Sequence, residues 1–92
     1  MILEHTKEFD KSVKKIADKI ALKRLDKLLD ELEQAQNLSE ISDVLPLTNK
    51  SKLYRIARGD FRLIVKYQQG EIIILLIDYR RRNEKTYRGL DF

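Results

Sequence analysis

The sequence predicts an α+β domain of two layers, with an N-terminal helical hairpin packed on an antiparallel sheet of three to four strands. Before residue 36, apolar residues recur every three or four positions, which is the helical period. After residue 52 they alternate or run together between short turn signals, which is typical of strands. Short turns require antiparallel pairing. Neither layer can bury its apolar side alone, so the helices must cover the sheet.

Two helices are predicted from the apolar spacing, after a short strand at Ile2 to Thr6. Thr6 is the expected N-cap of the first helix, whose apolar residues are Phe9, Val13, Ile16, Ala17 and Ile20. The second helix has its apolar residues at Leu22, Leu25, Leu28, Leu29, Leu32 and Ala35. No glycine or proline separates the two series, and we expect the break near Asp18 to Ala21.

Three strands are predicted in the second half, at Leu53 to Ala57, Phe61 to Tyr67 and Glu71 to Tyr79. Alternation places Phe61, Leu63 and Val65 on one face of the second strand. The other face, expected to be open, carries Arg55 and Arg62, with Ile64 and Lys66. The continuous apolar run of the third strand predicts a central position with both faces buried.

Two segments are expected outside the sheet. A loop is predicted at Gln36 to Asn49, a segment that contains Pro46, with one helical turn at Ser39 to Val44. The segment Arg80 to Lys85 is too charged for a strand, and Tyr87 follows it in a short C-terminal turn or tail.

Composition excludes several kinds of site. The chain has 92 residues, so we expect one domain over residues 1–92. It has no cysteine and a single histidine, His5, which leaves neither a metal site nor a catalytic triad to propose, and no cofactor is expected. The longest apolar run, Ile72 to Ile77, is too short to cross a membrane. We also expect no signal peptide, because the N-terminus has no apolar stretch of the kind that one requires. We therefore expect a cytoplasmic protein.

The net charge of +4 is distributed unevenly. Residues 1–46 contain 8 Lys or Arg and 10 Asp or Glu, which gives −2, whereas residues 47–92 contain 11 and 5, which gives +6. Seven of those eleven basic residues are arginine, whose planar guanidinium matches phosphate oxygens. The bias favours a polyanionic partner, most simply nucleic acid, although a well-solvated surface or an acidic protein partner also fits.

Three sequence motifs stand out in this basic half. They are Tyr54-Arg55-Ile56, the stretch Gly59-Asp60-Phe61-Arg62-Leu63-Ile64, and Asp78-Tyr79-Arg80-Arg81-Arg82 with Tyr87 after it. Together they resemble the RelE/ParE superfamily of bacterial type II toxins, and most closely the RelE-type mRNA interferases. The resemblance covers Leu45 to Leu90, about half the chain, and the preceding helices agree in order and length.

The resemblance implies the RelE-like fold and ribosome-dependent cleavage of mRNA. Arg62, Arg81 and Tyr87 match the family's catalytic positions. Further basic residues are expected to bind RNA, namely Lys50, Lys52, Arg55, Arg58, Arg80, Arg82 and Lys85. The chain departs from the pattern at Ala57, where many members carry a second basic residue, and at Asp78-Tyr79-Arg80, where glycine and histidine or lysine are usual.

Partners also follow from the resemblance. Such toxins are neutralised by a cognate antitoxin, often through an acidic segment, and a heterotetramer with that antitoxin is one expected assembly. The ribosome and its mRNA are the expected targets, and no membrane is involved.

The implied chemistry is metal-free. The RNA 2′-OH attacks the adjacent phosphate, which requires a base, an acid and positive charge on the pentacoordinate phosphate. We expect Arg62 and Arg81 to supply positive charge, because the very high pKa of arginine makes it a poor acid. Tyr87 acts as the base only if nearby cations lower its pKa from about 10, and otherwise it stacks on a base of the RNA.

Two other functions remain open at this stage, namely inhibition of DNA gyrase by protein binding, as in ParE-type toxins, and a degenerate member that only binds its antitoxin. The enzymatic interpretation predicts that Tyr87→Phe with Arg81→Ala relieves growth inhibition when the chain is induced in bacteria. Growth arrest that survives both substitutions would contradict it.

Overall fold

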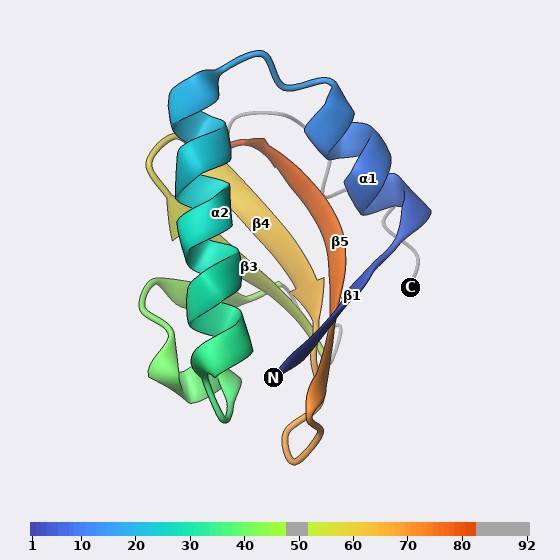
Figure 1. The fold of residues 1–92 in the computed structure, drawn as a ribbon. Coiled ribbons are helices and arrows are strands. Elements are labelled where there is room, and N and C mark those ends of the chain that lie inside the picture. Colours follow the sequence, from blue (N-terminus) through green and yellow to red (C-terminus); the bar gives the residue numbers. More distant parts are fainter. Residues whose placement is uncertain (48–51, 83–92) are drawn as a thin grey trace.

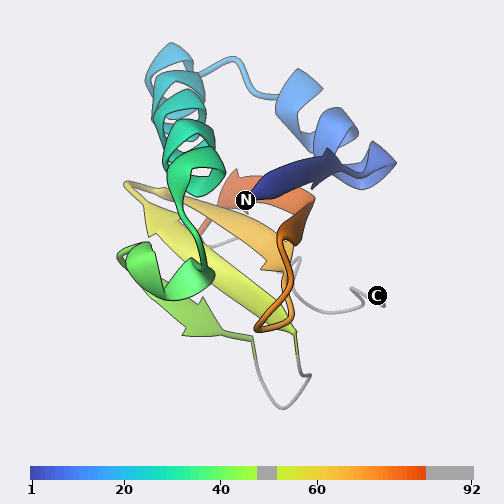
Figure 2. The ribbon, with the colours of Figure 1, turned by 60° about the horizontal axis from the view of Figure 1, so that its bottom comes forward.

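Two helices and a five-stranded sheet form the part of the chain that this computed structural model describes, residues 1–47 and 52–82 (Figure 1). The elements follow in the order β1 (Ile2–His5), α1 (Lys7–Lys14), α2 (Lys19–Gln34), the 3-10 turn η1 (Leu38–Glu40), β2 (Val44–Pro46), β3 (Leu53–Arg58), β4 (Phe61–Lys66) and β5 (Ile73–Arg81). Both helices lie on the same side of the sheet (Figure 2). The predicted α+β two-layer architecture is therefore confirmed.

The sheet has the strand order β1-β5-β4-β3-β2 and is larger than predicted. Strands β2 to β5 pair antiparallel, but β1 pairs parallel with β5, so the sheet is mixed. Strand β2 comes from the segment predicted as a loop, where Val44 pairs with Ile56 and Pro46 with Tyr54. Proline has no N–H for a second neighbour, which suits its place on an edge strand.

The helices begin where side chains cap them. Thr6 Oγ1 accepts a hydrogen bond from Phe9 N at 3.1 Å, which confirms the predicted N-cap. Asp18 caps α2 by accepting from Ile20 N at 2.9 Å and Ala21 N at 3.1 Å. The first helix ends at Lys14, earlier than the break predicted near Asp18 to Ala21. Ile20 lies in the first turn of α2 and is 63% exposed, so its assignment to the first apolar stripe was wrong.

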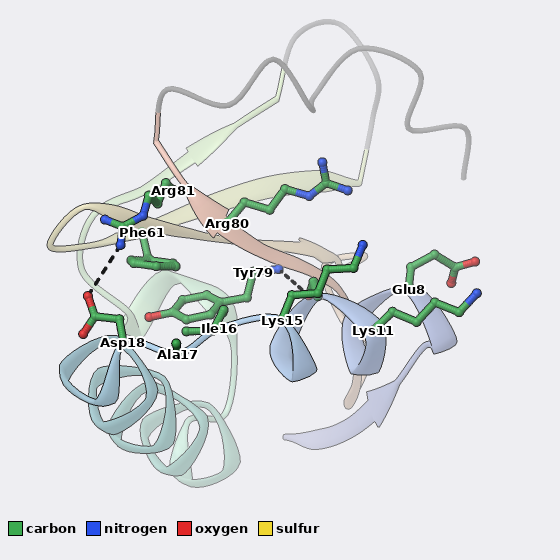
Figure 3. A pocket seen from close by; sticks show the side chains of 11 residues that line it. Glu8, Lys11, Lys15, Ile16, Ala17, Asp18, Phe61, Tyr79, Arg80 and Arg81 are labelled. Carbon is green, nitrogen blue, oxygen red and sulfur yellow. Dashed lines mark hydrogen bonds and ion pairs between the residues drawn. The ribbon is translucent and has the colours of Figure 1, made fainter.

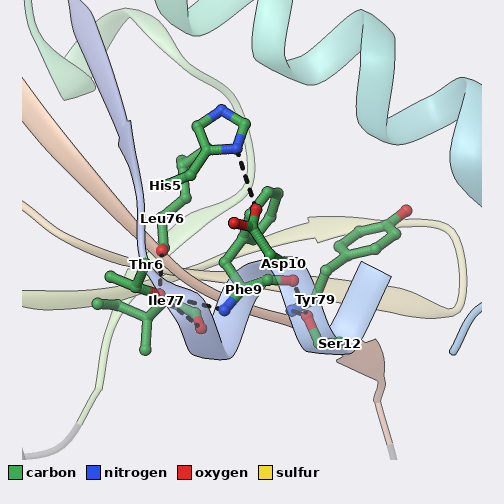
Figure 4. Close-up of polar contacts among 8 residues, drawn as sticks. All are labelled: His5, Thr6, Phe9, Asp10, Ser12, Leu76, Ile77 and Tyr79. Carbon is green, nitrogen blue, oxygen red and sulfur yellow. Dashed lines mark hydrogen bonds and ion pairs between the residues drawn. The ribbon is translucent and has the colours of Figure 1, made fainter. Parts of the chain in front are cut away.

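Helix α1 packs mainly against β5 and not along α2, so the predicted helical hairpin is open (Figure 1). Where β1 ends, side chains of α1 and its cap bond to the edge of β5 (Figure 4). Thr6 Oγ1 donates to Leu76 O at 2.8 Å, and Ser12 Oγ accepts from Tyr79 N at 3.1 Å. These bonds replace those that a neighbouring strand would provide.

The core lies between α2 and the inner face of the sheet. Its strand residues include Leu63 and Val65 of β4, as alternation predicted, and Leu76 and Tyr79 of β5. The Tyr79 hydroxyl donates to Ala21 O at 2.7 Å, and the Tyr79 ring stacks on Phe61 with centroids 5.0 Å apart. Burial raises the pKa of Tyr79 to about 12, so this tyrosine is a structural residue.

The opposite face of the sheet is less open than predicted. Leu53, Ile64 and Ile77 are buried, yet they do not belong to the core cluster under the helices. Strand β5 also continues two residues beyond its predicted end, because Arg81 pairs with Phe61 of β4. Within the described residues, neither helix has the length and apolar character needed to span a bilayer.

The bond between Ser12 and the edge of β5 gives a stability prediction. Ser12→Ala leaves the backbone N–H of buried Tyr79 without its acceptor, and we expect it to lower the free energy of unfolding by about 1–3 kcal/mol. Urea denaturation measures this change. Ser42→Ala, at an exposed serine, is the matched control and should stay within about 0.5 kcal/mol of the parent. Equal stability of the two variants would contradict the role of Ser12.

Candidate nucleic-acid interface

Two arginines lie side by side on the sheet face that the helices leave uncovered. Arg62 of β4 is the direct cross-strand partner of Arg80 of β5, and Ala57 of β3 lies on the other side of Arg62. Like charges directly opposite each other are unfavourable in a sheet, so this pair concentrates positive charge at a cost in stability. Such a pair is suited to an anionic group that contacts both guanidinium groups at once.

Two further basic residues share this face. Arg55 pairs with Ile64 and Lys66 pairs with Leu53 and Leu75, so alternation places both side chains on the side of Arg62. Both are half-buried. We call Arg55, Arg62, Lys66 and Arg80 the basic face. Lys66 was not among the predicted RNA-binding residues, although the alternation of its strand already placed it beside Arg62.

A β-bulge in β5 decides which arginine faces Arg62. The pairing shifts by one residue between Ile64 and Val65 of β4, so that Ile77 is the extra residue of β5. Before the bulge Leu76 points into the core, and after it Tyr79 does. Strict alternation from Leu76 would have carried Arg81 to the basic face, whereas the bulge carries Arg80 there.

The hairpin before β4 holds the side chain of Arg62. Its Nη1 donates to Gly59 O at 2.9 Å and to Phe61 O at 2.8 Å. Gly59 has a φ of +59°, a conformation that a side chain disfavours, and this tight turn brings its carbonyl to the guanidinium. The Arg62 Nε atom is buried and has no hydrogen-bond partner among the described residues.

Asp78 holds the side chain of Arg80. The Asp78 carboxylate forms an ion pair with Arg80 Nε, and alternation places it on the basic face opposite Ile64. Asp78 is only 2% exposed, and its Oδ1 has no partner among the described residues. Burial raises the pKa of this carboxyl above its ordinary value, and the charge of Arg80 acts in the opposite direction. Sequence reasoning missed Asp78 because an acid after an apolar run gives no signal of its burial.

Arg81 lies on the other face of the sheet. It is the cross-strand partner of Phe61, and its guanidinium carbon lies 5.0 Å from the centroid of that ring. Its Nη2 is 3.8 Å from the carboxylate of Asp18, the cap of α2. Arg62 and Arg81, both predicted to be catalytic, are therefore not brought together. Tyr87, the third predicted member, lies outside the described residues.

The predicted RNA-binding residues divide in the same way. Arg55 and Arg80 lie on the basic face, while Arg58 points to the helices, where it donates to Ser42 O at 3.1 Å and approaches Glu31 at 3.4 Å. Exposed side chains at the strand ends include Lys52, just before β3, and Arg82, just after β5. Lys50 and Lys85 lie outside the described residues.

The residue types that commonly bind metal ions are dispersed over the described part of the chain. Among residues 1–47 and 52–82, no three His, Cys, Asp or Glu side chains gather in a way that suits a metal ion. His5 is an exposed residue 3.4 Å from Asp10, and its ring meets Phe9 edge-on.

Comparison with known proteins finds one matching family and several solved structures with a similar fold. The family described as "ParE toxin of type II toxin-antitoxin system, parDE" matches residues 3–84. Among curated proteins, none matches the chain at a significant level.

Solved structures share the fold. The RelB-RelE antitoxin-toxin complex from Methanococcus jannaschii has a chain 18% identical, with a TM-score of 0.72 over 89% of this chain and 91% of that one. The archaeal RelE-RelB complex from Pyrococcus horikoshii gives 24% identity and a TM-score of 0.70, covering 90% and 96%. The intact RelBE complex of Escherichia coli gives 15% and 0.66, covering 90% and 98%. The fold is therefore RelE-like, as the resemblance implied.

The buried acid beside Arg80 predicts a pH dependence of stability. An unfolded Asp has a pKa of about 3.9, and the folded pKa of Asp78 is higher, so the folded state holds the proton more tightly. The stability contribution of Asp78 is therefore greatest at low pH. It falls as the pH rises from about 4 through the folded pKa.

Asp78→Asn removes this titration. We expect the difference in unfolding free energy, parent minus variant, to decrease as the pH rises through that window and then to level off. Urea denaturation at a series of pH values measures it. A difference that instead grows with pH would mean that the Arg80 charge outweighs burial and lowers the pKa of Asp78.

Proposed function

The chain belongs to the family of ParE toxins of type II toxin–antitoxin systems, and on this premise we propose that it arrests growth as a ribosome-dependent mRNA endoribonuclease. The observation that carries the proposal is the adjacency of Arg62 and Arg80 on the uncovered sheet face. Two like charges set opposite each other lower the stability of the sheet, and a phosphate that contacts both guanidinium groups at once would offset that loss.

The proposed reaction needs only the RNA, the protein and a proton acceptor and donor. The 2′-OH gives up its proton to a base, and its oxygen forms a new bond to the adjacent phosphorus. The bond from phosphorus to the 5′-oxygen then breaks, and that oxygen takes a proton. The products are a 2′,3′-cyclic phosphate and a 5′-hydroxyl, and no oxidant or metal takes part.

In this proposal Arg62 and Arg80 stabilise the pentacoordinate phosphate. Arginine is a fixed positive charge in proteins, and the strand register places both residues on one face, so they can bind the two non-bridging oxygens together. Arg81 acts as a positioning residue instead, because it is held over Phe61 and near Asp18 on the opposite face. Tyr87 keeps its proposed role as the base. The ribosome would hold the mRNA in place and so supply much of the positioning.

The proposal extends to partners and location. RelB antitoxins accompany the structurally similar toxins from Methanococcus jannaschii and Pyrococcus horikoshii, which supports a cognate antitoxin for this chain. The charge of +6 on residues 47–92 fits an acidic antitoxin segment that orders on binding, within a heterodimer or heterotetramer. Such a toxin works in the cytoplasm, where the ribosomes are.

A second function is favoured by the family match itself, since the family is described as that of ParE toxins. In that alternative the chain inhibits DNA gyrase by protein binding, and the arginine pair contacts an acidic patch of the target. A member that binds only its antitoxin is the remaining alternative, and Ala57, between basic Arg55 and Arg58, is the position that weakens the basic face.

The arginines themselves provide the test. We expect Arg62→Gln and Arg80→Gln each to reduce cleavage of a translated reporter mRNA about 100- to 1,000-fold, because each removes one group that stabilises the transition state. The neighbouring Arg81→Gln, with the same charge change on the opposite face, should have a much smaller effect. Primer extension after induction, with and without a translation inhibitor, maps the cuts.

The outcomes separate the three functions. Cuts within codons that vanish when translation stops support the enzyme. Growth arrest with intact mRNA, together with inhibited supercoiling by purified gyrase, supports the second function instead. Absence of growth arrest supports the antitoxin-binding member. Because Arg80→Gln leaves buried Asp78 unpaired, Arg80→Lys, which keeps the charge, is tested beside it, and thermal unfolding reports on the fold of each variant.

A further inference from the structure

A cavity of about 550 Å³ lies between α1, the segment joining α1 to α2, and the end of β5 (Figure 3). Four of the side chains that line it are basic, namely Lys11, Lys15, Arg80 and Arg81, against two acids, Glu8 and Asp18. The cavity is therefore net positive, and its size is that of a typical ligand site. Arg62 does not line the cavity, whereas Arg80 belongs both to the cavity and to the Arg62–Arg80 pair.

The cations of this cavity are not equivalent. Arg81 already lies near Asp18 and over Phe61. Lys11 and Lys15 are exposed, and among the described residues neither forms an ion pair. In Figure 3 Lys15 and Arg80 extend toward the same opening, with Lys11 farther along α1. Arg80 contacts Asp78 through Nε, which leaves its two terminal nitrogens for a ligand. Lys11, Lys15 and Arg80 are thus the charges available to a ligand.

Continuity with the basic face indicates the shape of that ligand. Arg80 is the cross-strand partner of Arg62 and also lines the cavity, so positive charge runs from β4 across the end of β5 to α1. A small anion would contact only some of these cationic side chains. A polymer with a negative charge on every unit, such as a nucleic-acid backbone, would contact all of them.

We propose that Lys11, Lys15 and Arg80 form a second phosphate subsite for single-stranded RNA, which binds the backbone next to the nucleotide held at Arg62 and Arg80. This inference rests on the proposed ribonuclease function and names the path of its substrate. The RNA strand crosses the end of β5 and continues along the outer side of α1. The subsite contributes sequence-independent binding, because lysines that contact phosphates do not contact the bases.

The floor of the cavity favours RNA over a peptide partner. Its two rings, Phe61 and Tyr79, are 5% and 1% exposed, so they offer no socket for the apolar anchor of a protein segment. Long, exposed cationic side chains at the rim suit repeated phosphate groups instead. An acidic peptide is the alternative occupant, and the test below distinguishes the two.

The test compares two pairs of lysines in α1 and at its C-cap, Lys15. Lys11→Gln with Lys15→Gln neutralises the subsite, whereas Lys7→Gln with Lys14→Gln neutralises two exposed lysines that do not line the cavity. Glutamine keeps the helix propensity of lysine, and both pairs change the net charge equally. The probe is a 2′-O-methyl oligonucleotide, which cannot be cleaved, and its binding to the full chain is measured by fluorescence anisotropy over a salt series.

We expect the subsite pair to weaken binding of an octanucleotide severalfold and to reduce the slope of log K against log salt by about 1.4, which is two contacts at about 0.7 each. Binding of a dinucleotide, too short to reach α1 from Arg62, should stay unchanged. The control pair should leave both nearly as they are.

Other outcomes overturn the proposal. Equal losses in both pairs would mean that only the net charge matters, and no loss in either pair would mean that RNA does not reach α1. If the subsite pair leaves octanucleotide binding intact but weakens binding of an acidic antitoxin peptide, the cavity belongs to a protein partner. The ribonuclease function fails separately, when the parent chain leaves translated mRNA uncut.

Discussion

The pairing of β4 with β5 is the constraint on which the rest of this molecule depends. This pairing determines which side chains face the core and which face away from the helices. On the inner face it stacks Phe61 against Tyr79 and anchors the core to α2 through Ala21. On the outer face it places Arg62 against Arg80. The one-residue bulge at Ile77 makes both possible, because without it the aromatic ring and the arginine would exchange faces.

The same pairing explains why a buried acid is retained at this point. Two opposed arginines repel each other, and Asp78 lies next to them with its carboxylate on Arg80. Burying that carboxylate is unfavourable, and so is setting the two cations side by side. Each unfavourable arrangement partly offsets the other, and together they fix the direction of the Arg80 guanidinium. Local destabilisation of this kind is common where a protein holds a functional group in place.

Much of the fold was accessible from the sequence. Apolar periodicity predicted the two helices and strands β3 to β5. Thr6 was correctly predicted as the N-cap of the first helix. Alternation along β4 correctly separated the core residues from Arg62. Strand β2 was missed because three residues around a proline carry no alternation. The parallel pairing of β1 is a long-range contact that no local pattern encodes.

The candidate site was harder to predict than the fold, for a definite reason. Period-two reasoning fails at a bulge, and nothing in the run from Ile72 to Tyr79 marks Ile77 as the extra residue. Arg55, Arg62 and Arg80 could be named from composition and resemblance, but the facing of Arg80 and Arg81 depends on that single backbone irregularity. Lys11 and Lys15 could not be predicted as part of a basic surface, because they join it only when α1 lies beside β5.

The covering of β5 by α1 also bears on self-association. At nine residues β5 is the longest strand, and a long unpaired strand edge is a template for sheet-to-sheet aggregation. Thr6 and Ser12 occupy that edge beyond the end of β1, while the outermost strands have only four and three residues and one of them contains Pro46. The sheet therefore presents short borders to other copies of the chain, which favours a protein that stays dispersed until a specific partner binds it.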